Sequence, residues 1–161
     1  LKKMGYENNF VFHFAGAFFQ QEEKNFFSKY VKNNALYNVE YWGIVDGKDK
    51  KTLLEKGNVF FLLTNYPKEG QPISILEAMA NGMTIVTTNH AGIPDIVGDE
   101  NGLVCDVNNI DINTIAAYLV KCYQDRDYLN KIGLFNYKFV ETYFSESTYI
   151  DNMISIFDIF V

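Results

Sequence analysis

Glu69 and Glu77 lie on either side of Pro72, in the part of the chain whose residue types and spacing could do chemistry. Pro72 is suited to the first position of a helix, and Gly82 to the residue just past its end. Glu69 would then lie in the loop before the helix, and Glu77 about 7.5 Å along the helix axis from Pro72. That separation is similar to the span from a pyrophosphate to the ribose of its nucleotide, and a carboxylate can accept hydrogen bonds from two ribose hydroxyls. A nucleotide could bind along this segment, with Glu69 close enough to the loop tip to meet sugar hydroxyls.

The first turn of this predicted helix offers backbone amides to the same site. Pro72 has no N–H group, so the free donors are chiefly those of Ile73 and Ser74. Free amides and the helix dipole together favour an anion at a helix N-terminus. We therefore expect a phosphate group to bind there.

The spacing of the two glutamates is a weak signal by itself. Ten of the 161 residues are glutamate, so a pair at this separation can arise by chance. Both acids also have purely structural explanations. Glu69 could be a solvated loop residue, and Glu77 a helix-surface acid favoured by the N-terminal dipole. The surrounding elements and motifs must decide between these alternatives.

Short apolar runs rich in β-formers alternate with helical patterns, which predicts βαβ units. The run from Val59 to Leu63 has no polar alternation, as expected for a central strand. The predicted strands are Phe10–Ala15, Val39–Trp42, Val59–Leu63, Met83–Thr88 and Gly102–Cys105. The predicted helices between them are Gln20–Lys32, Lys50–Lys56, Pro72–Asn81 and Ile93–Val97. The expected fold class is α/β, a doubly wound and mainly parallel sheet.

Beyond the last strand the pattern is helical only. Three helices are predicted at about residues 112–124, 127–142 and 146–160, with Asp111 and Ser145 as N-caps. In the last helix an apolar stripe recurs at helical spacing, which we interpret as packing surface. Its residues are Tyr149, Met153, Phe157 and Phe160. These helices form the expected C-terminal cover of the sheet.

Ligands of open α/β sheets bind beyond the carboxyl ends of the strands. The loops to inspect therefore follow Leu63 and Thr88, and all three prolines of the chain lie there: Pro67, Pro72 and Pro94. Because proline presets φ, we expect both loops to hold fixed shapes. His90 lies in the second loop and could reach a ligand, whereas His13 lies among aromatic residues of a predicted strand.

Composition and charge exclude several classes of protein. The chain is 48% hydrophobic and 21% charged, which predicts a folded globular domain, and 161 residues correspond to one such domain. Residues 61–161 carry five basic and thirteen acidic residues, so nucleic acid is an unexpected partner. Cys105 and Cys122 lack metal-ligand spacing and are interpreted as buried apolar residues, and no metal site is expected. No run approaches the ~20 apolar residues that span a bilayer, so we expect a cytoplasmic protein.

Two other nucleotide-binding classes do not fit the glycines. A dinucleotide-binding domain requires GxGxxG after the first strand, whereas the chain has Gly16-Ala17-Phe18-Phe19 there. A P-loop requires Gly-Lys-Ser/Thr, but Gly47-Lys48 is followed by Asp49.

Several motifs resemble the C-terminal domain of two-domain GT-B glycosyltransferases, specifically the retaining family 4, also called glycosyl transferases group 1. The motifs are Glu69-Gly70-x-Pro72 through Glu77-Ala78-Met79-Ala80-x-Gly82, then Gly92-Ile93-Pro94-Asp95-Ile96-Val97 and Asn101-Gly102-Leu103-Val104. A looser likeness begins at Phe14-Ala15-Gly16 and extends into the C-terminal helices. The resemblance implies a Rossmann-like half of a GT-B fold over residues 1–161.

The resemblance also implies roles for individual residues. Glu69 would approach the donor sugar and act as the catalytic residue, and Glu77 would bind the ribose. The backbone of Gly70, Gln71, Pro72, Ile73 and Ser74 would lie against the sugar and diphosphate, and Ile44 and Val45 near the base. The donor would be a UDP-, GDP- or ADP-sugar of hexose type, transferred with retention and without a cofactor or bound metal.

The chain departs from the family pattern in its basic residues. The Arg and Lys that bind diphosphate in the family belong to an upstream strand and helix, and Lys68 is the only basic residue beside the motif. An acceptor glycan or lipid would bind a missing N-terminal domain, which could bring the longer protein to the inner face of the membrane. We expect the 161 residues alone to bind donor without turnover. The alternative is a non-catalytic nucleotide-binding or protein-docking module.

Overall fold

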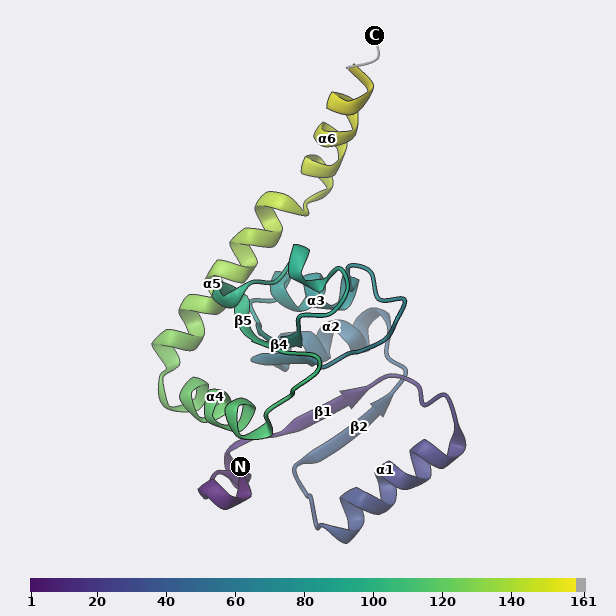
Figure 1. Cartoon of the computed structure of the whole chain (residues 1–161), viewed down its shortest axis with the longest axis vertical. Coiled ribbons are helices and arrows are strands. Elements are labelled where there is room, and N and C mark those ends of the chain that lie inside the picture. Colours follow the sequence, from purple (N-terminus) through teal and green to yellow (C-terminus); the bar gives the residue numbers. More distant parts are fainter. Residues whose placement is uncertain (159–161) are drawn as a thin grey trace. The chain divides into compact units, whose positions relative to one another are not determined.

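The protein is described by a computed structural model that covers residues 1–158 (Figure 1). Its contacts divide the chain into two compact units, residues 1–56 and the residues from Gly57 onward. Every strand pairing in both units is parallel. The predicted α/β class with parallel sheets is thereby confirmed, although the strands form two hydrogen-bonded sheets rather than one.

The first unit is built around a two-stranded sheet. Strand β1 (Phe12–Ala15) pairs with β2 (Val39–Gly43), and Phe12 lies opposite Val39. The crossover contains α1 (Gln21–Asn33), and α2 (Gly47–Lys56) follows β2; the short 3-10 helices η1 (Lys2–Met4) and η2 (Glu7–Asn9) precede β1. Aromatic rings pack against one another across these elements, chiefly those of Phe14, Phe18, Phe27 and Tyr41. None of these side chains is fully buried.

The second unit has a three-stranded sheet in the order β3 (Val59–Leu62), β4 (Thr84–Thr88) and β5 (Gly102–Cys105). Strand β4 is the central one, and all five of its residues are buried. Three of them are threonines, and each hydroxyl is hydrogen-bonded. The Thr84 hydroxyl bonds to the Tyr118 hydroxyl, and those of Thr87 and Thr88 donate to the carbonyls of Leu62 and Thr64. The prediction that residues 59–63 form a central strand is wrong for this sheet, in which β3 lies at the edge.

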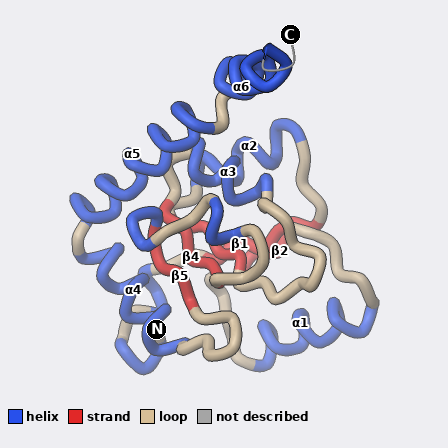
Figure 2. The backbone as a smooth tube through the Cα atoms, turned by 45° about the horizontal axis from the view of Figure 1, so that its top comes forward, coloured by secondary structure: helices blue, strands red, loops and turns tan. Residues whose placement is uncertain are grey.

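Helices pack against this sheet (Figure 2). They are α3 (Ile73–Ala80), α4 (Ile112–Gln124) and α5 (Arg126–Tyr143), with the 3-10 helices η3 (Ile93–Asp95) and η4 (Asp99–Asn101) between β4 and β5; α6 (Glu146–Asp158) follows α5 and projects away from the sheet. Helices α3 and α5 contact each other and β4. One apolar cluster joins β4 and β5 to α4 and α5: Val86, Cys105, Ile115, Tyr118, Cys122 and Leu129. Both cysteines are buried and free, as predicted.

Helix α3 ends at Ala80, one residue before the predicted end, with Gly82 just past the end as predicted. Gly82 adopts φ +70°, a left-handed conformation that glycine tolerates best. The Gly82 amide donates to the Met79 carbonyl, and the Met83 amide donates to the Ala78 carbonyl. These two bonds form the Schellman motif that closes many helices. At the other end the helix begins at Ile73, one residue later than predicted, and Pro72 is its N-cap.

The C-terminal helices agree with the prediction in position but not in packing. Asp111 and Ser145 both cap as expected, since each side chain accepts a hydrogen bond from an amide of the following helix. The stripe on α6 is exposed instead of packed: Tyr149 is 65% and Phe157 is 62% exposed. The reason is that α6 makes its contacts chiefly with α5. Phe160 lies outside the described residues.

Candidate functional site

Two loops meet at the carboxyl edge of the sheet in the second unit. The first runs from Leu63 to Pro72 and links β3 to α3; the second begins at Asn89, after β4. Because β3 and β4 are parallel neighbours, both loops leave the same edge of the sheet. The Thr88 hydroxyl donates to the Thr64 carbonyl at 2.6 Å, which joins the loops where they start.

A tight turn presents Glu69. The Glu69 amide donates to the Tyr66 carbonyl at 3.0 Å, which closes a four-residue turn with Pro67 in its second position. Proline is favoured there because its ring presets φ. The Glu69 side chain is half-buried, whereas Lys68 beside it is exposed.

The first turn of α3 lies directly after this loop. Pro72 is buried, and its carbonyl accepts a hydrogen bond from the Ile75 amide at 3.0 Å. Buried Ile75, Ala78 and Met79 anchor the helix to the sheet. Pro72 has no side-chain acceptor for the amides of the first turn, which belong to Ile73 and Ser74. The expected role of these two amides in binding an anion stays a prediction.

Glu77 lies on α3 four residues after Ile73, and therefore on the same helical face. Its side chain is half-buried, and the helix rise places it about 6 Å along the axis from Ile73. Ile73 is 71% exposed, so this face borders solvent at the N-terminal turn. Loop and helix together present Glu69, the two amides and Glu77 in sequence along one segment.

Close backbone approach fixes the second loop against the first. A Cβ atom added to Gly92 would lie 2.7 Å from the Gly70 carbonyl oxygen, a distance that only glycine allows. Sequence reasoning included Gly92 in a family motif but did not predict its contact with Gly70.

His90 occupies a position that sequence reasoning did not predict. The sequence allows His90 to reach a ligand, whereas in the structure its Nε2 atom lies 2.8 Å from the Tyr66 carbonyl oxygen. The imidazole thus binds the first loop of the protein itself. The only signal in the sequence is that His90 is a polar residue shortly after a buried strand. Its acceptor, the Tyr66 carbonyl oxygen, is a backbone atom, which no sequence motif identifies.

Ile44 and Val45 follow β2 in the first unit. Ile44 is 80% exposed and Val45 is half-buried. Their expected place near a base stays a prediction.

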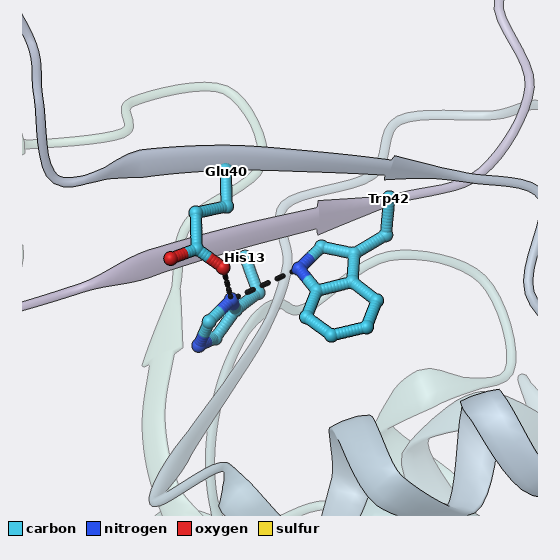
Figure 3. Close-up of polar contacts among 3 residues, drawn as sticks. All are labelled: His13, Glu40 and Trp42. Atoms are coloured by element: carbon cyan, nitrogen blue, oxygen red, sulfur yellow. Dashed lines mark hydrogen bonds and ion pairs between the residues drawn. The ribbon is translucent and has the colours of Figure 1, made fainter.

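His13 belongs to a polar cluster of the first unit (Figure 3). The Trp42 indole N–H donates to Nδ1 of His13 at 3.1 Å, and a carboxylate oxygen of Glu40 lies 3.1 Å from the same nitrogen. One nitrogen cannot accept from the indole and donate to the carboxylate at once. Neutral His13 can keep the Trp42 bond, and only a protonated Nδ1 can donate to Glu40. The cluster joins the paired strands β1 and β2.

Two further findings apply to residues 1–158. No group of three His, Cys, Asp or Glu side chains there is placed to hold a metal ion. Every helix in that range is too short or too polar to traverse a lipid bilayer.

Residues 1–139 match the sequence model of a family described as glycosyl transferases group 1. Among curated relatives, the O-antigen chain mannosyltransferase B of Escherichia coli is 36% identical over 87 residues, which are 54% of this chain and 22% of that protein. The chain spans about a fifth of the length of the curated relatives it matches.

Solved structures show the same fold. Anabaena Alr3699/HepE, crystallised in complex with UDP, superposes with a TM-score of 0.81 at 17% identity over 94% of this chain and 41% of that one. The C-terminal domain of the group 1 protein LpcC of Francisella tularensis gives 0.65 at 23% identity, over 78% of this chain and 64% of that one. The fold is that of GT-B glycosyltransferase domains.

Proposed function

The chain belongs to the glycosyl transferases group 1 family, and on this premise we propose that it is the donor-binding part of a glycosyltransferase that uses a nucleotide sugar. The observation that carries the proposal is the segment from Glu69 to Glu77. It presents two half-buried carboxylates on either side of the amides at the start of α3. A nucleotide sugar offers matching groups in the same order: hydroxyls, a diphosphate and a ribose.

Each site residue has a proposed role. The amides of Ile73 and Ser74 bind the diphosphate, since a helix N-terminus favours an anion. Glu77 accepts hydrogen bonds from the ribose hydroxyls, and such bonds to a charged acceptor are stronger than those between neutral groups. Glu69 faces the transferred sugar, with the backbone of Gly70, Gln71 and Pro72 beside it.

The proposal extends to the reaction. A hexose-type sugar leaves the nucleoside diphosphate with retention of configuration, as in family 4, and moves to a glycan or lipid acceptor held by a further domain. The amides at the start of α3 stabilise the negative charge that develops on the departing diphosphate. The relative named as an O-antigen chain mannosyltransferase supports a role in polysaccharide synthesis, and we propose that this role is carried out at the cytoplasmic face of a membrane.

The test is a calorimetric titration of the 161-residue chain with UDP, GDP and ADP. We expect one of the three to bind, and Glu77→Gln to weaken it at least tenfold, which corresponds to about 1.4 kcal/mol. The matched control is Glu141→Gln, which changes an exposed glutamate on α5 and should leave the dissociation constant unchanged.

The outcomes separate two readings of the site. Binding that Glu77→Gln and Glu69→Gln both leave unchanged would contradict the assigned roles and favour the non-catalytic module. If the folded wild-type chain binds none of the three nucleotides, the segment from Glu69 to Glu77 does not form a donor site in this chain.

A further inference from the structure

We propose that His90 is a positioning residue for the candidate site: its hydrogen bond to the Tyr66 carbonyl holds the turn that presents Glu69. The consequence for ligand binding rests on the proposed function of this site. The coupling between the two loops rests on geometry alone, and the experiment below tests the two separately.

The Tyr66 carbonyl oxygen is shared by two donors. It accepts the Glu69 amide at 3.0 Å, the bond that closes the turn, and Nε2 of His90 lies 2.8 Å from it. A carbonyl oxygen only accepts, so Nε2 must carry the proton of the imidazole. A carbonyl has two lone pairs and can satisfy both donors. His90 thus acts on the very atom that fixes the position of Glu69.

Apart from the hydrogen bond from the Tyr66 amide to the Thr64 hydroxyl at 3.1 Å, few contacts hold the middle of the first loop. None of the residues from Asn65 to Gln71 is fully buried, and six of the seven are exposed. The loop is tied at its start by the Thr88 hydroxyl on the Thr64 carbonyl, and near its end by the approach of Gly92 to Gly70. The His90 bond lies between these two ties, at the turn itself.

The backbone around His90 is arranged to make these contacts. Ala91 has φ +49°, a left-handed conformation that is uncommon for a residue other than glycine. It lies between His90 and Gly92, both of which contact the first loop. The His90 carbonyl accepts the Ile93 amide at 3.1 Å, which closes this second turn. Strained residues of this kind persist where the surrounding contacts hold them.

The test compares three substitutions at one position. His90→Gln keeps an N–H donor at nearly the distance of Nε2, whereas His90→Leu keeps the bulk and removes the donor. His90→Asn is polar but too short to reach the Tyr66 carbonyl, so it separates polarity from the bond itself. If His90→Leu does not fold, His90→Asn still provides a variant without the hydrogen bond to Tyr66.

The first readout is hydrogen exchange of the Glu69 amide, because that amide closes the turn. We expect exchange at least tenfold faster in His90→Leu and His90→Asn than in the wild type, and wild-type exchange in His90→Gln. Equal Glu69 exchange in wild type and in the folded Leu and Asn variants would overturn the proposal. So would fast exchange in His90→Gln that matches His90→Leu.

The second readout is the dissociation constant for UDP, GDP and ADP. We expect about a fivefold weakening of the nucleotide that binds in His90→Leu and His90→Asn, with recovery in His90→Gln. Unchanged affinity in the Leu and Asn variants would overturn the consequence for the site. If the wild type binds none of the three, the proposed function fails alone, and the exchange of Glu69 still decides the role of His90.

Discussion

Asn136 shows how much of the second unit depends on one buried polar side chain. It is fully buried on α5, and its Nδ2 group donates to the carbonyls of Met83 and Asn101 at 2.8 and 2.9 Å. Its Oδ1 atom accepts from Nδ2 of Asn101 at 2.8 Å, and Asn101 in turn accepts from the Gly98 amide. One side chain therefore links α5, the start of β4 and η4.

Replacing Asn136 by leucine should be strongly destabilising. Asn136→Leu leaves two buried carbonyls and the Asn101 amide without this partner, and each buried unsatisfied group costs about 1–3 kcal/mol. We expect the free energy of unfolding in urea to fall by about 3 kcal/mol or more. Asn130→Leu, at an exposed position of the same helix, is the control and should change it by less than about 0.5 kcal/mol. Similar losses in both variants would show that the buried network contributes nothing special.

At the residue scale, the sequence predicts which residues share the loop and helix of the candidate site, but not the contacts between its two loops. Proline favours the start of a helix and glycine the position just past its end, so Pro72 and Gly82 mark the helix in the sequence. The structure places Glu69 in the loop before this helix and Glu77 on it. The contacts of His90 with Tyr66 and of Gly92 with Gly70 depend on two loops that meet only in the folded chain. No local pattern contains that information.

Helix α4 illustrates what is predictable at the scale of an element. Its bounds, Ile112–Gln124, are those predicted, because Asp111 is a strong N-cap and an apolar face follows it. Strand β5 likewise has its predicted bounds, since Gly102 and Cys105 delimit a short apolar run. The pairing of strands into two sheets, and the edge position of β3, depend on tertiary contacts that local patterns do not specify.

The cap of α4 should make stability depend on acidity. Hydrogen bonds from the Thr114 hydroxyl and the Asn113 amide lower the pKa of Asp111 from its ordinary value. A carboxyl whose pKa is lower in the folded state stabilises the fold above its unfolded pKa, and this contribution is lost as pH falls through the folded pKa. Asp111→Asn should therefore lower the melting temperature at pH 7.

The difference between wild type and Asp111→Asn should disappear once the carboxyl is protonated, below its lowered pKa. Thermal melts of both proteins from about pH 7 to about pH 2 measure it. The control is Asp151→Asn, an exposed acid on α6. A difference that stays constant over the whole range would contradict a role for the charge of Asp111.

At the scale of the whole molecule, burial and charge are both unevenly distributed. Every fully buried side chain in residues 1–158 belongs to the second unit, between Pro72 and Asn136. Residues 61–161 carry five basic and thirteen acidic residues, a net charge of −8. The net negative charge of these residues does not attract a diphosphate. Its binding would therefore depend on local hydrogen-bond donors such as the amides at the start of α3.

The most direct test of the account is to locate a bound nucleotide by NMR chemical-shift mapping of the 161-residue chain. UDP, GDP and ADP are added in turn to ¹⁵N-labelled protein, and the shift change of each backbone amide is measured. We expect the largest changes at Ile73 and Ser74, with smaller ones at Glu69 and Gly70. Changes centred elsewhere, with the amides of the first turn of α3 unaffected, would show that this helix start does not bind the diphosphate.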